Sequence, residues 1–254
     1  MPVIDRRALM VGGASAALAS GHALRAVAAE PAYREVGTPN SPGRVAGQIK
    51  YTGPGIDVPS FPVVKDHEIC GHDDRSPKSL RVSDAGEFGD CVVELKGIQE
   101  GKPWDEVFNN GKIYQIDCSF QPYVQIIRSD AFVEVFNYDS ILHNIHAYEV
   151  FKGTRRSMFN FAQPQAGQVD RIDLKLRRGN LLMIDCNAHN WMAAWVYTSA
   201  SPYLSVTSLD GRFEITDVPP GRYQLSIWHP MLGEKWADIS IAPNADLNLD
   251  LALN

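Results

Sequence analysis

Short runs of β-branched and aromatic residues, separated by glycine and proline turns, follow one another along nearly the whole chain. Examples are "AFVEVFNY", "NLLMIDC" and "RYQLSIW", and turn sequences such as "LDG" and "DVPPG" lie between such runs. The stretch "GKPWDEVFNN" is a weak candidate for a helix. Strands of this length at this spacing predict an all-β protein built as a sandwich.

Composition narrows the classes of partner. With 254 residues, of which 44% are apolar, the chain can bury one large core or two small ones. Lys and Arg number 24 against 30 Asp and Glu, and no basic block stands out, which argues against a nucleic-acid surface. No uncharged apolar stretch reaches the roughly 20 residues that a membrane-spanning helix needs.

The first 28 residues predict an export signal. Arg6 and Arg7 precede a short apolar run at 8–19, and small residues at 26–28 offer a cleavage site. Arg-Arg-Ala-Leu resembles the twin-arginine motif, which a translocase reads, and an ordinary secretory signal is the alternative. We therefore expect a periplasmic protein whose cysteines can pair in an oxidising compartment.

The segment "MIDCNAHNWM" brings Cys186, His189 and Met192 together in the spacing C-x2-H-x2-M. Copper sites for electron transfer use one thiolate and two imidazoles in a near-trigonal plane, with a weak axial thioether. One tight loop cannot surround an ion, so the second imidazole must come from a distant strand. His143 in "NYDSILHNIHAYEV" supplies it. The sequence predicts a metal site of His143, Cys186 and His189, with Met192 axial.

These residues, together with "FQPYVQIIRSDAFVEVFNYD", resemble the cupredoxin family of blue copper proteins over residues 112–199. The short ligand loop and the H-N-x-H stretch are similar to those of the amicyanin-like members. The resemblance implies a Greek-key sandwich with one type 1 copper ion that carries single electrons and is not an enzyme. It also implies that His146 is not a ligand. Asn144 stands next to the ligand His143, where its side chain could tie the two ligand loops together.

A carrier of electrons should expose an edge of one ligand to its partner. For this loop that edge should be His189, so we expect a redox protein to dock near it. The alternatives are a copper carrier that hands over the ion, or a structural module with a vestigial site. Copper carriers often use several methionines, and this segment offers Met158, Met183 and Met192. Cys186 could also be a buried thiol or a disulfide partner.

The tail "VTSLDGRFEITDVPPGRYQLSIWHP" resembles the carboxypeptidase regulatory-like domain, a small transthyretin-type β-sandwich. The opening strands of such a domain match "VAGQIKY" and "CVVELKG", which lie far upstream. This implies one domain of residues 44–110 plus 200–254, with the cupredoxin domain, 112–199, inserted into it or paired with it. Exposed loops tolerate such insertions. The whole arrangement resembles exported bacterial proteins of the methylamine-utilisation-like kind.

The other three cysteines allow one disulfide. Cys118 begins the cupredoxin segment and Cys70 lies in a predicted loop, so a Cys70–Cys118 bridge would staple the two domains. Cys91 is the alternative partner or a buried thiol. The "DHEICGH" segment around Cys70 also holds His67 and His72. We interpret it as a disulfide loop with ordinary polar histidines, and a second metal site is the alternative.

Three further side chains have expected positions. Trp191 and Trp195 should cover the metal site and fill the seam between the two domains. His229, in "IWHP", reads as a surface histidine at a strand end, and the alternative is that it faces the copper domain.

Overall fold

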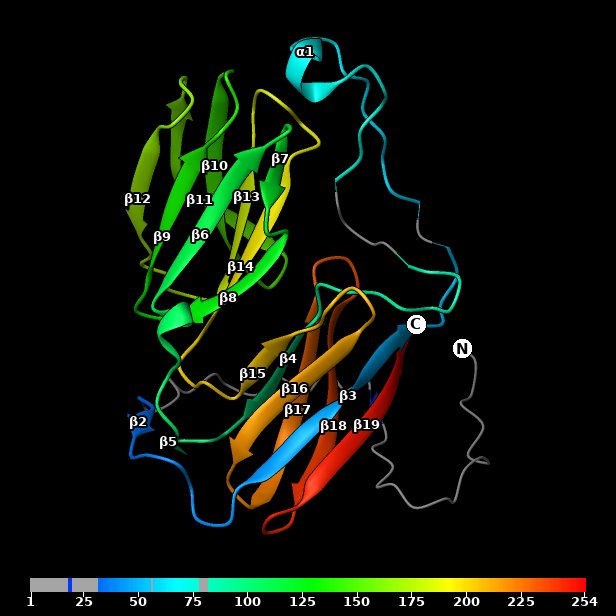
Figure 1. Ribbon diagram of the computed structural model, residues 1–254, viewed down its shortest axis with the longest axis vertical. Coiled ribbons are helices and arrows are strands. Elements are labelled where there is room, and N and C mark those ends of the chain that lie inside the picture. Colours follow the sequence, from blue (N-terminus) through cyan, green and yellow to red (C-terminus); the bar gives the residue numbers. More distant parts are fainter. Residues whose placement is uncertain (1–17, 20–31, 56, 78–81) are drawn as a thin grey trace.

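The computed structural model describes residues 18–19, 32–55, 57–77 and 82–254 as two β-units, one above the other in Figure 1. The predicted signal peptide, residues 1–28, lies outside the described residues except for the two-residue strand β1 (Leu18–Ala19). Within the described residues, no helix is long and apolar enough to cross a membrane. The prediction of an all-β sandwich architecture is confirmed.

The lower unit, here called the split unit, consists of strands from both ends of the chain. One sheet has the order β1-β18-β17-β4-β15, and the other has the order β16-β3-β19. Antiparallel pairing joins β3 to β16 and β4 to both β15 and β17, so early strands share sheets with late ones. The strands are β3 (Gly43–Tyr51), β4 (Val92–Lys96), β15 (Leu204–Val206), β16 (Arg212–Val218), β17 (Gly221–His229), β18 (Gly233–Ile241) and β19 (Asp246–Leu253).

The upper unit, here called the central unit, lies between β5 and β15 in the sequence. Its two sheets have the orders β11-β10-β13-β14-β8 and β12-β9-β6-β7. The strands are β6 (Asn110–Ile116), β7 (Ser119–Gln121), β8 (Val124–Arg128), β9 (Phe132–Asn137), β10 (His143–Phe151), β11 (Thr154–Gln163), β12 (Val169–Asp173), β13 (Leu181–Asp185) and β14 (Ala193–Ser199). A separate parallel pair joins β2 (Arg34–Glu35) to β5 (Glu100–Gly101).

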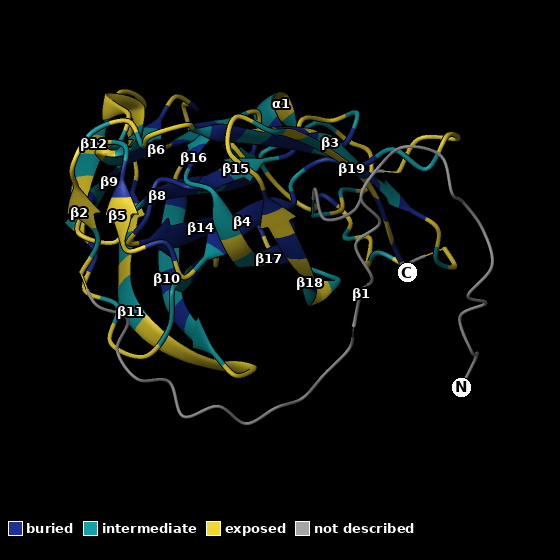
Figure 2. Ribbon diagram, turned by 90° about the horizontal axis from the view of Figure 1, so that it is seen from below, coloured by how far each residue is buried: buried dark blue, intermediate teal, exposed yellow. Residues whose placement is uncertain are grey.

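Alternating side chains give each unit its own core. On β16, Phe213 and Ile215 are buried between exposed neighbours. On β10, His143, Ile145 and Ala147 are buried and alternate with half-buried residues. This period of two places one face of each strand in the core. In Figure 2 the inner strands are mostly buried, whereas β11 is mostly exposed.

Close approach of two strands explains one glycine. At Gly47 on β3, a Cβ atom would come within 1.8 Å of the carbonyl oxygen of Leu249 on the parallel neighbour β19. Only glycine fits there without moving the backbone.

Helical structure differs from the prediction. "GKPWDEVFNN" forms only a single 3-10 turn, η1 (Glu106–Phe108), where the Asp105 side chain accepts a hydrogen bond of 3.0 Å from the backbone N–H of Val107. The short helix α1 (His67–Cys70), beside the central unit in Figure 1, was not predicted, because four residues are too few to show helical periodicity.

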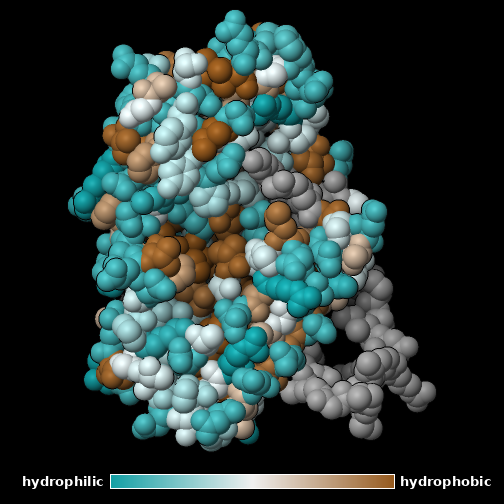
Figure 3. Space-filling view, in the orientation of Figure 1, coloured by the Kyte–Doolittle hydropathy of each residue, from teal (hydrophilic) through white to brown (hydrophobic). Residues whose placement is uncertain are grey.

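A third apolar cluster lies at the seam between the units. The ring centroids of Trp195 on β14 and Trp228 on β17 are 5.5 Å apart, so the predicted position of Trp195 in the seam is confirmed. A hollow of about 980 Å³ opens beside this cluster and is lined in part by Trp104, Phe108 and Ile126. Figure 3 shows apolar side chains gathered between the two units.

Glu94 on β4 is the main polar link across the seam. It is 3% exposed, and its carboxylate accepts hydrogen bonds of 2.6 Å from both the Tyr197 and the Ser199 hydroxyls of β14. Lys96 pairs with the same carboxylate. The buried charge is therefore fully partnered, which is what makes its burial tolerable.

We predict that Glu94→Ala lowers the free energy of unfolding by about 2–4 kcal/mol, because it removes the acceptor of the buried Tyr197 hydroxyl, one acceptor of Ser199 and the carboxylate partner of Lys96. Chemical denaturation checks this. The control Glu100→Ala removes the partner of exposed Arg34 and should change stability by less than about 1 kcal/mol. Equal effects of the two substitutions would show that Glu94 does not join the units.

Candidate metal centre

Two neighbouring strands bring three predicted ligands together. His143 is the first residue of β10, Cys186 follows the end of β13, and His189 lies in the loop that leads to β14. Because β10 and β13 pair with each other, the start of one lies beside the end of the other. All three side chains are buried, and their donor atoms lie within 4.8 Å of one another.

The separations suit one metal ion. The Nδ1 atoms of His143 and His189 are 3.1 Å apart, and the Cys186 sulfur lies 3.9 Å from His189 Nδ1. Ligand atoms at about 2.0–2.3 Å from an ion in a trigonal plane lie about 3.5–3.7 Å from one another. The residues present therefore fit a metal with two imidazole ligands and one thiolate ligand.

Two carboxylates orient the histidines. His143 Nε2 lies 2.7 Å from the Asp139 carboxylate, and His189 Nε2 lies 2.9 Å from the Asp66 carboxylate. A carboxylate oxygen accepts hydrogen bonds, so Nε2 of each ring is the donor and Nδ1 of each ring faces the other. Two lone pairs that face each other at 3.1 Å repel unless a proton or a metal ion lies between them. Such carboxylate–histidine pairs are typical around metal ligands.

The Cys186 thiol ionises readily. Burial raises its pKa, but interactions with His143 and His189 lower it, and backbone N–H groups of Asn144 and Ala188 lower it further. The resulting pKa is about 6. The N–H of Asn144 lies 3.3 Å from the sulfur. A thiolate at neutral pH is the form that binds metals.

The first histidine is held in a charged network. Burial lowers the pKa of His143, but Asp139 and the Cys186 sulfur raise it, so that the net direction is upward. Burial raises the pKa of Asp139, and the hydrogen bonds from His143 and from the backbone N–H groups of Cys118 and Asp117 lower it overall. The carboxylate of Asp139 therefore stays ionised beside the ligand.

Met192 is buried, at 2% exposure, in the same core cluster as Cys186 and Trp191. Its backbone N–H donates a 3.0 Å hydrogen bond to the carbonyl of His189, which closes the tight turn of the loop. Its axial role stays a prediction.

Two neighbours of His143 behave as expected. The Asn144 side chain accepts a 3.3 Å hydrogen bond from the backbone N–H of Asn187, so it ties the two ligand loops together. His146 faces away from the three donor atoms and lies within 2.9 Å of the Ser157 hydroxyl and 2.7 Å of the Tyr148 hydroxyl.

The predicted disulfide is confirmed. Cys70 is bonded to Cys118, and Cys91 and Cys186 are free. The rings of His67 and His72 stack with centroids 4.6 Å apart. Because Cys70 is oxidised, it cannot serve as a thiolate ligand. A second metal site formed by His67, Cys70 and His72, which was the alternative, would therefore lack its sulfur ligand.

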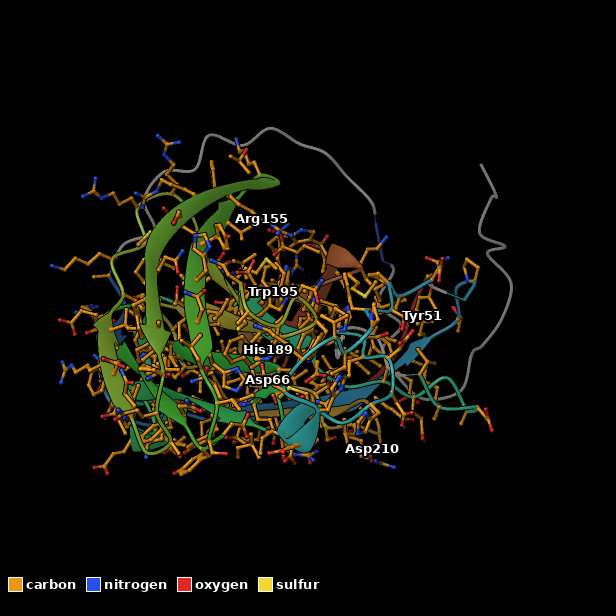
Figure 4. All side chains as sticks on the ribbon, turned by 90° about the horizontal axis from the view of Figure 1, so that it is seen from above. Tyr51, Asp66, Arg155, His189, Trp195 and Asp210 are labelled. Atoms are coloured by element: carbon orange, nitrogen blue, oxygen red, sulfur yellow. A yellow bond between two sulfur atoms is a disulfide. The ribbon has the colours of Figure 1, made fainter. Side chains whose placement is uncertain are left out.

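The expectation of an exposed His189 edge is wrong. His189 is 0% exposed, because Asp66 covers its Nε2 and the Trp191 ring lies 5.3 Å away. The indole N–H of Trp191 donates to the carbonyl of Cys118 at 3.0 Å, so the predicted covering role of Trp191 is confirmed. Figure 4 shows Asp66 and His189 side by side, next to α1.

His229 is also not a surface residue. It is 1% exposed at the end of β17, and its ring meets Phe88 edge-on at 5.7 Å in the core region of the split unit. Burial lowers its pKa to about 4. The strand end was predicted correctly, but the loops that cover it were not apparent from the local pattern.

The sequence prediction missed both orienting carboxylates. Asp139 lies four residues before His143, and this short separation is a signal that could have suggested the contact. Asp66 is far from His189 in the sequence, and no local pattern indicates that the two meet.

No protein-family model matches the sequence, and no curated protein matches it. Among solved structures, similar ones include a purple cupredoxin from Nitrosopumilus maritimus, with 23% identity over 35% of this chain and 99% of that chain, at a TM-score of 0.28. Amicyanin from Paracoccus versutus has 13% identity over 42% of this chain and 97% of its own, at a TM-score of 0.30. A copper-containing nitrite reductase from Thermus scotoductus has 17% identity over 35% of this chain, at a TM-score of 0.29, and the match spans only 22% of that enzyme. Because these TM-scores are low, the site is interpreted from its own geometry alone.

We predict that the metal-free protein shows a thiolate absorbance transition near pH 6, below the usual cysteine value of about 8.5. The thiolate is present above this pH and is lost as the pH falls through it. Ultraviolet absorbance near 240 nm measures the transition. Cys186→Ala should abolish it, whereas Cys91→Ala should preserve it, since burial raises the pKa of Cys91. A transition only above pH 8 would contradict the arrangement described.

Proposed function

We propose that the protein is a periplasmic type 1 copper protein that carries single electrons. His143, Cys186 and His189 would be the strong ligands of one copper ion, and Met192 would be the axial ligand. The observation that carries this proposal is the buried cluster of two imidazole nitrogens and one ionisable thiol, with all three donor atoms within 4.8 Å of one another.

The donor set favours copper. Thiolate suits Cu(I), imidazole suits both oxidation states, and a site with both donors serves an ion that changes oxidation state. Bound copper would take up and release one electron. The chain contributes a site in which the ligands are already close and buried, and in which Asp139 and Asp66 hold both rings by their Nε2 atoms. Such a site limits how far atoms move when an electron arrives.

Retention of the ion is favoured over delivery. All three strong ligands are buried, and the loop that holds Asp66 covers His189. Of the methionines in this segment, Met192 lies in the same core cluster as Cys186, whereas the sulfur of Met158 on the mostly exposed strand β11 contacts Arg156 at 2.9 Å. A redox partner that docks near His189 would therefore meet the covering loop first.

We further propose that residues 112–199 form a cupredoxin domain inserted into a carboxypeptidase regulatory-like domain of residues 44–110 and 200–254. The pairing of β3 with β16, and of β4 with β17, supports an insertion. Export by the twin-arginine route rests on Arg6 and Arg7. The Cys70–Cys118 disulfide suits the oxidising compartment that such export implies.

Addition of Cu(II) to the purified mature protein should produce an intense visible band from charge transfer between thiolate and copper. The band should bleach on reduction and return on oxidation. Cys186→Ser should abolish it and His143→Ala should greatly weaken it. Met192→Leu should retain the colour with a changed reduction potential, because the axial ligand tunes that potential.

Cys91→Ser is the matched control, since Cys91 is the other buried free cysteine, and it should leave the band unchanged. A colourless protein that binds only Cu(I), and passes it to a competing metal-free protein, would contradict electron carriage and support delivery.

A further inference from the structure

We propose that Asp66 is a positioning residue for His189, presented by a disulfide-anchored cap that closes the centre. The cap is the segment from Phe61 to Arg75, which includes α1. This inference deepens the proposed function, because it concerns a ligand of the proposed copper site. It predicts properties of the metal-free protein as well, so the two ideas can fail separately.

The backbone conformation of Asp66 is uncommon, and its side chain contacts His189 rather than α1. It precedes α1 in the left-handed conformation, with φ 56°, which is uncommon for a residue other than glycine. Its side chain makes no capping hydrogen bond to the helix. The carboxylate instead lies 2.9 Å from His189 Nε2, and Lys65 contacts it at 4.0 Å. An uncommon backbone conformation that serves a contact outside its own helix indicates a role for that contact.

The cap is fastened at its base. Phe61 and Arg75 exchange backbone hydrogen bonds of 2.7 and 2.8 Å, which closes the segment into a loop. The Arg75 side chain also donates to the carbonyl of Asp117 in the β6–β7 turn. The cap therefore forms a compact flap on the central unit.

The disulfide links α1 of the cap to the hydrogen-bond network around His143. Cys70, four residues after Asp66, is bonded to Cys118. The backbone N–H of Cys118 donates to the Asp139 carboxylate at 2.9 Å, and Asp139 contacts His143. Both disulfide sulfurs lie within 4.8 Å of a His189 ring nitrogen. Together with the contact between the two rings, these contacts form a closed path that passes through both histidines.

This arrangement has two physical consequences. Acceptance of the Nε2 proton by Asp66 fixes the His189 tautomer that presents Nδ1 to Cys186 and His143. In addition, His189 is 0% exposed and the cap lies against its Nε2 side, so a reagent or an ion reaches the centre from this side only when the cap opens.

The tautomer of His189 tests the first consequence. In the metal-free mature protein, the ¹⁵N shifts of its ring should report a proton on Nε2. Asp66→Asn should retain this tautomer, because the amide oxygen still accepts the hydrogen bond, whereas Asp66→Ala should give a mixture of tautomers. Asp73→Ala, at an exposed position of the same cap, is the matched control. An unchanged tautomer in Asp66→Ala would overturn the positioning role.

The reactivity of Cys186 tests the second consequence. In the metal-free protein, alkylation of Cys186 should be at least about tenfold faster once a phosphine has reduced the Cys70–Cys118 disulfide, because the cap opens more often. Peptide mass mapping separates Cys186 from the newly formed thiols, and circular dichroism shows whether the fold persists.

Asp66→Ala keeps the disulfide and should also accelerate the alkylation of Cys186. This variant tests the closing role of the cap if reduction of the disulfide unfolds the protein. Equal rates in the wild type and Asp66→Ala, together with an unchanged rate in any reduced protein that stays folded, would overturn the closing role of the cap. If the His189 tautomer and the Cys186 alkylation rates are as predicted but copper produces no visible band, the proposed function is contradicted and the role of the cap is not.

Discussion

The centre depends on one electrostatic constraint, which is that two imidazole nitrogens face each other beside the Cys186 sulfur. Nε2 of each ring contacts a carboxylate, Asp139 for His143 and Asp66 for His189. The two Nδ1 atoms lie 3.1 Å apart, and both are near the Cys186 sulfur. Two facing acceptor nitrogens with no proton or cation between them are both unsatisfied, which is costly in a buried site. A proton can relieve it in the metal-free protein, and a metal ion relieves it more completely.

The rest of the structure keeps these three groups from moving apart. Pairing of β10 with β13 sets the positions of His143 and Cys186, and the Asn144 side chain ties their loops together. Asp139 and Asp66 each hold one ring by its Nε2 atom. The Cys70–Cys118 disulfide joins the segment that carries Asp66 to the β6–β7 turn, where the backbone N–H of Cys118 donates to Asp139. The split unit supports this assembly through the seam around Glu94 and Trp228.

Local patterns predicted much of the fold and of the candidate site. Short alternating runs indicated the strands, and the spacing of Cys186, His189 and Met192 indicated a loop that gathers metal ligands. The cover over His189 was not predictable in this way, because Asp66 reaches it from a distant segment with no periodicity of its own. The burial of His229 was missed for the same reason, since it results from tertiary packing rather than from the strand pattern.

X-ray absorption at the copper edge tests the central claim most directly, because it counts the atoms around the ion in the loaded protein. The account predicts two imidazole nitrogens at about 2.0 Å and one sulfur at about 2.3 Å or slightly less. The short sulfur distance should vanish in Cys186→Ser and persist in Cys91→Ser. A first shell of nitrogen and oxygen alone, or one with two short sulfur ligands, would contradict the centre described.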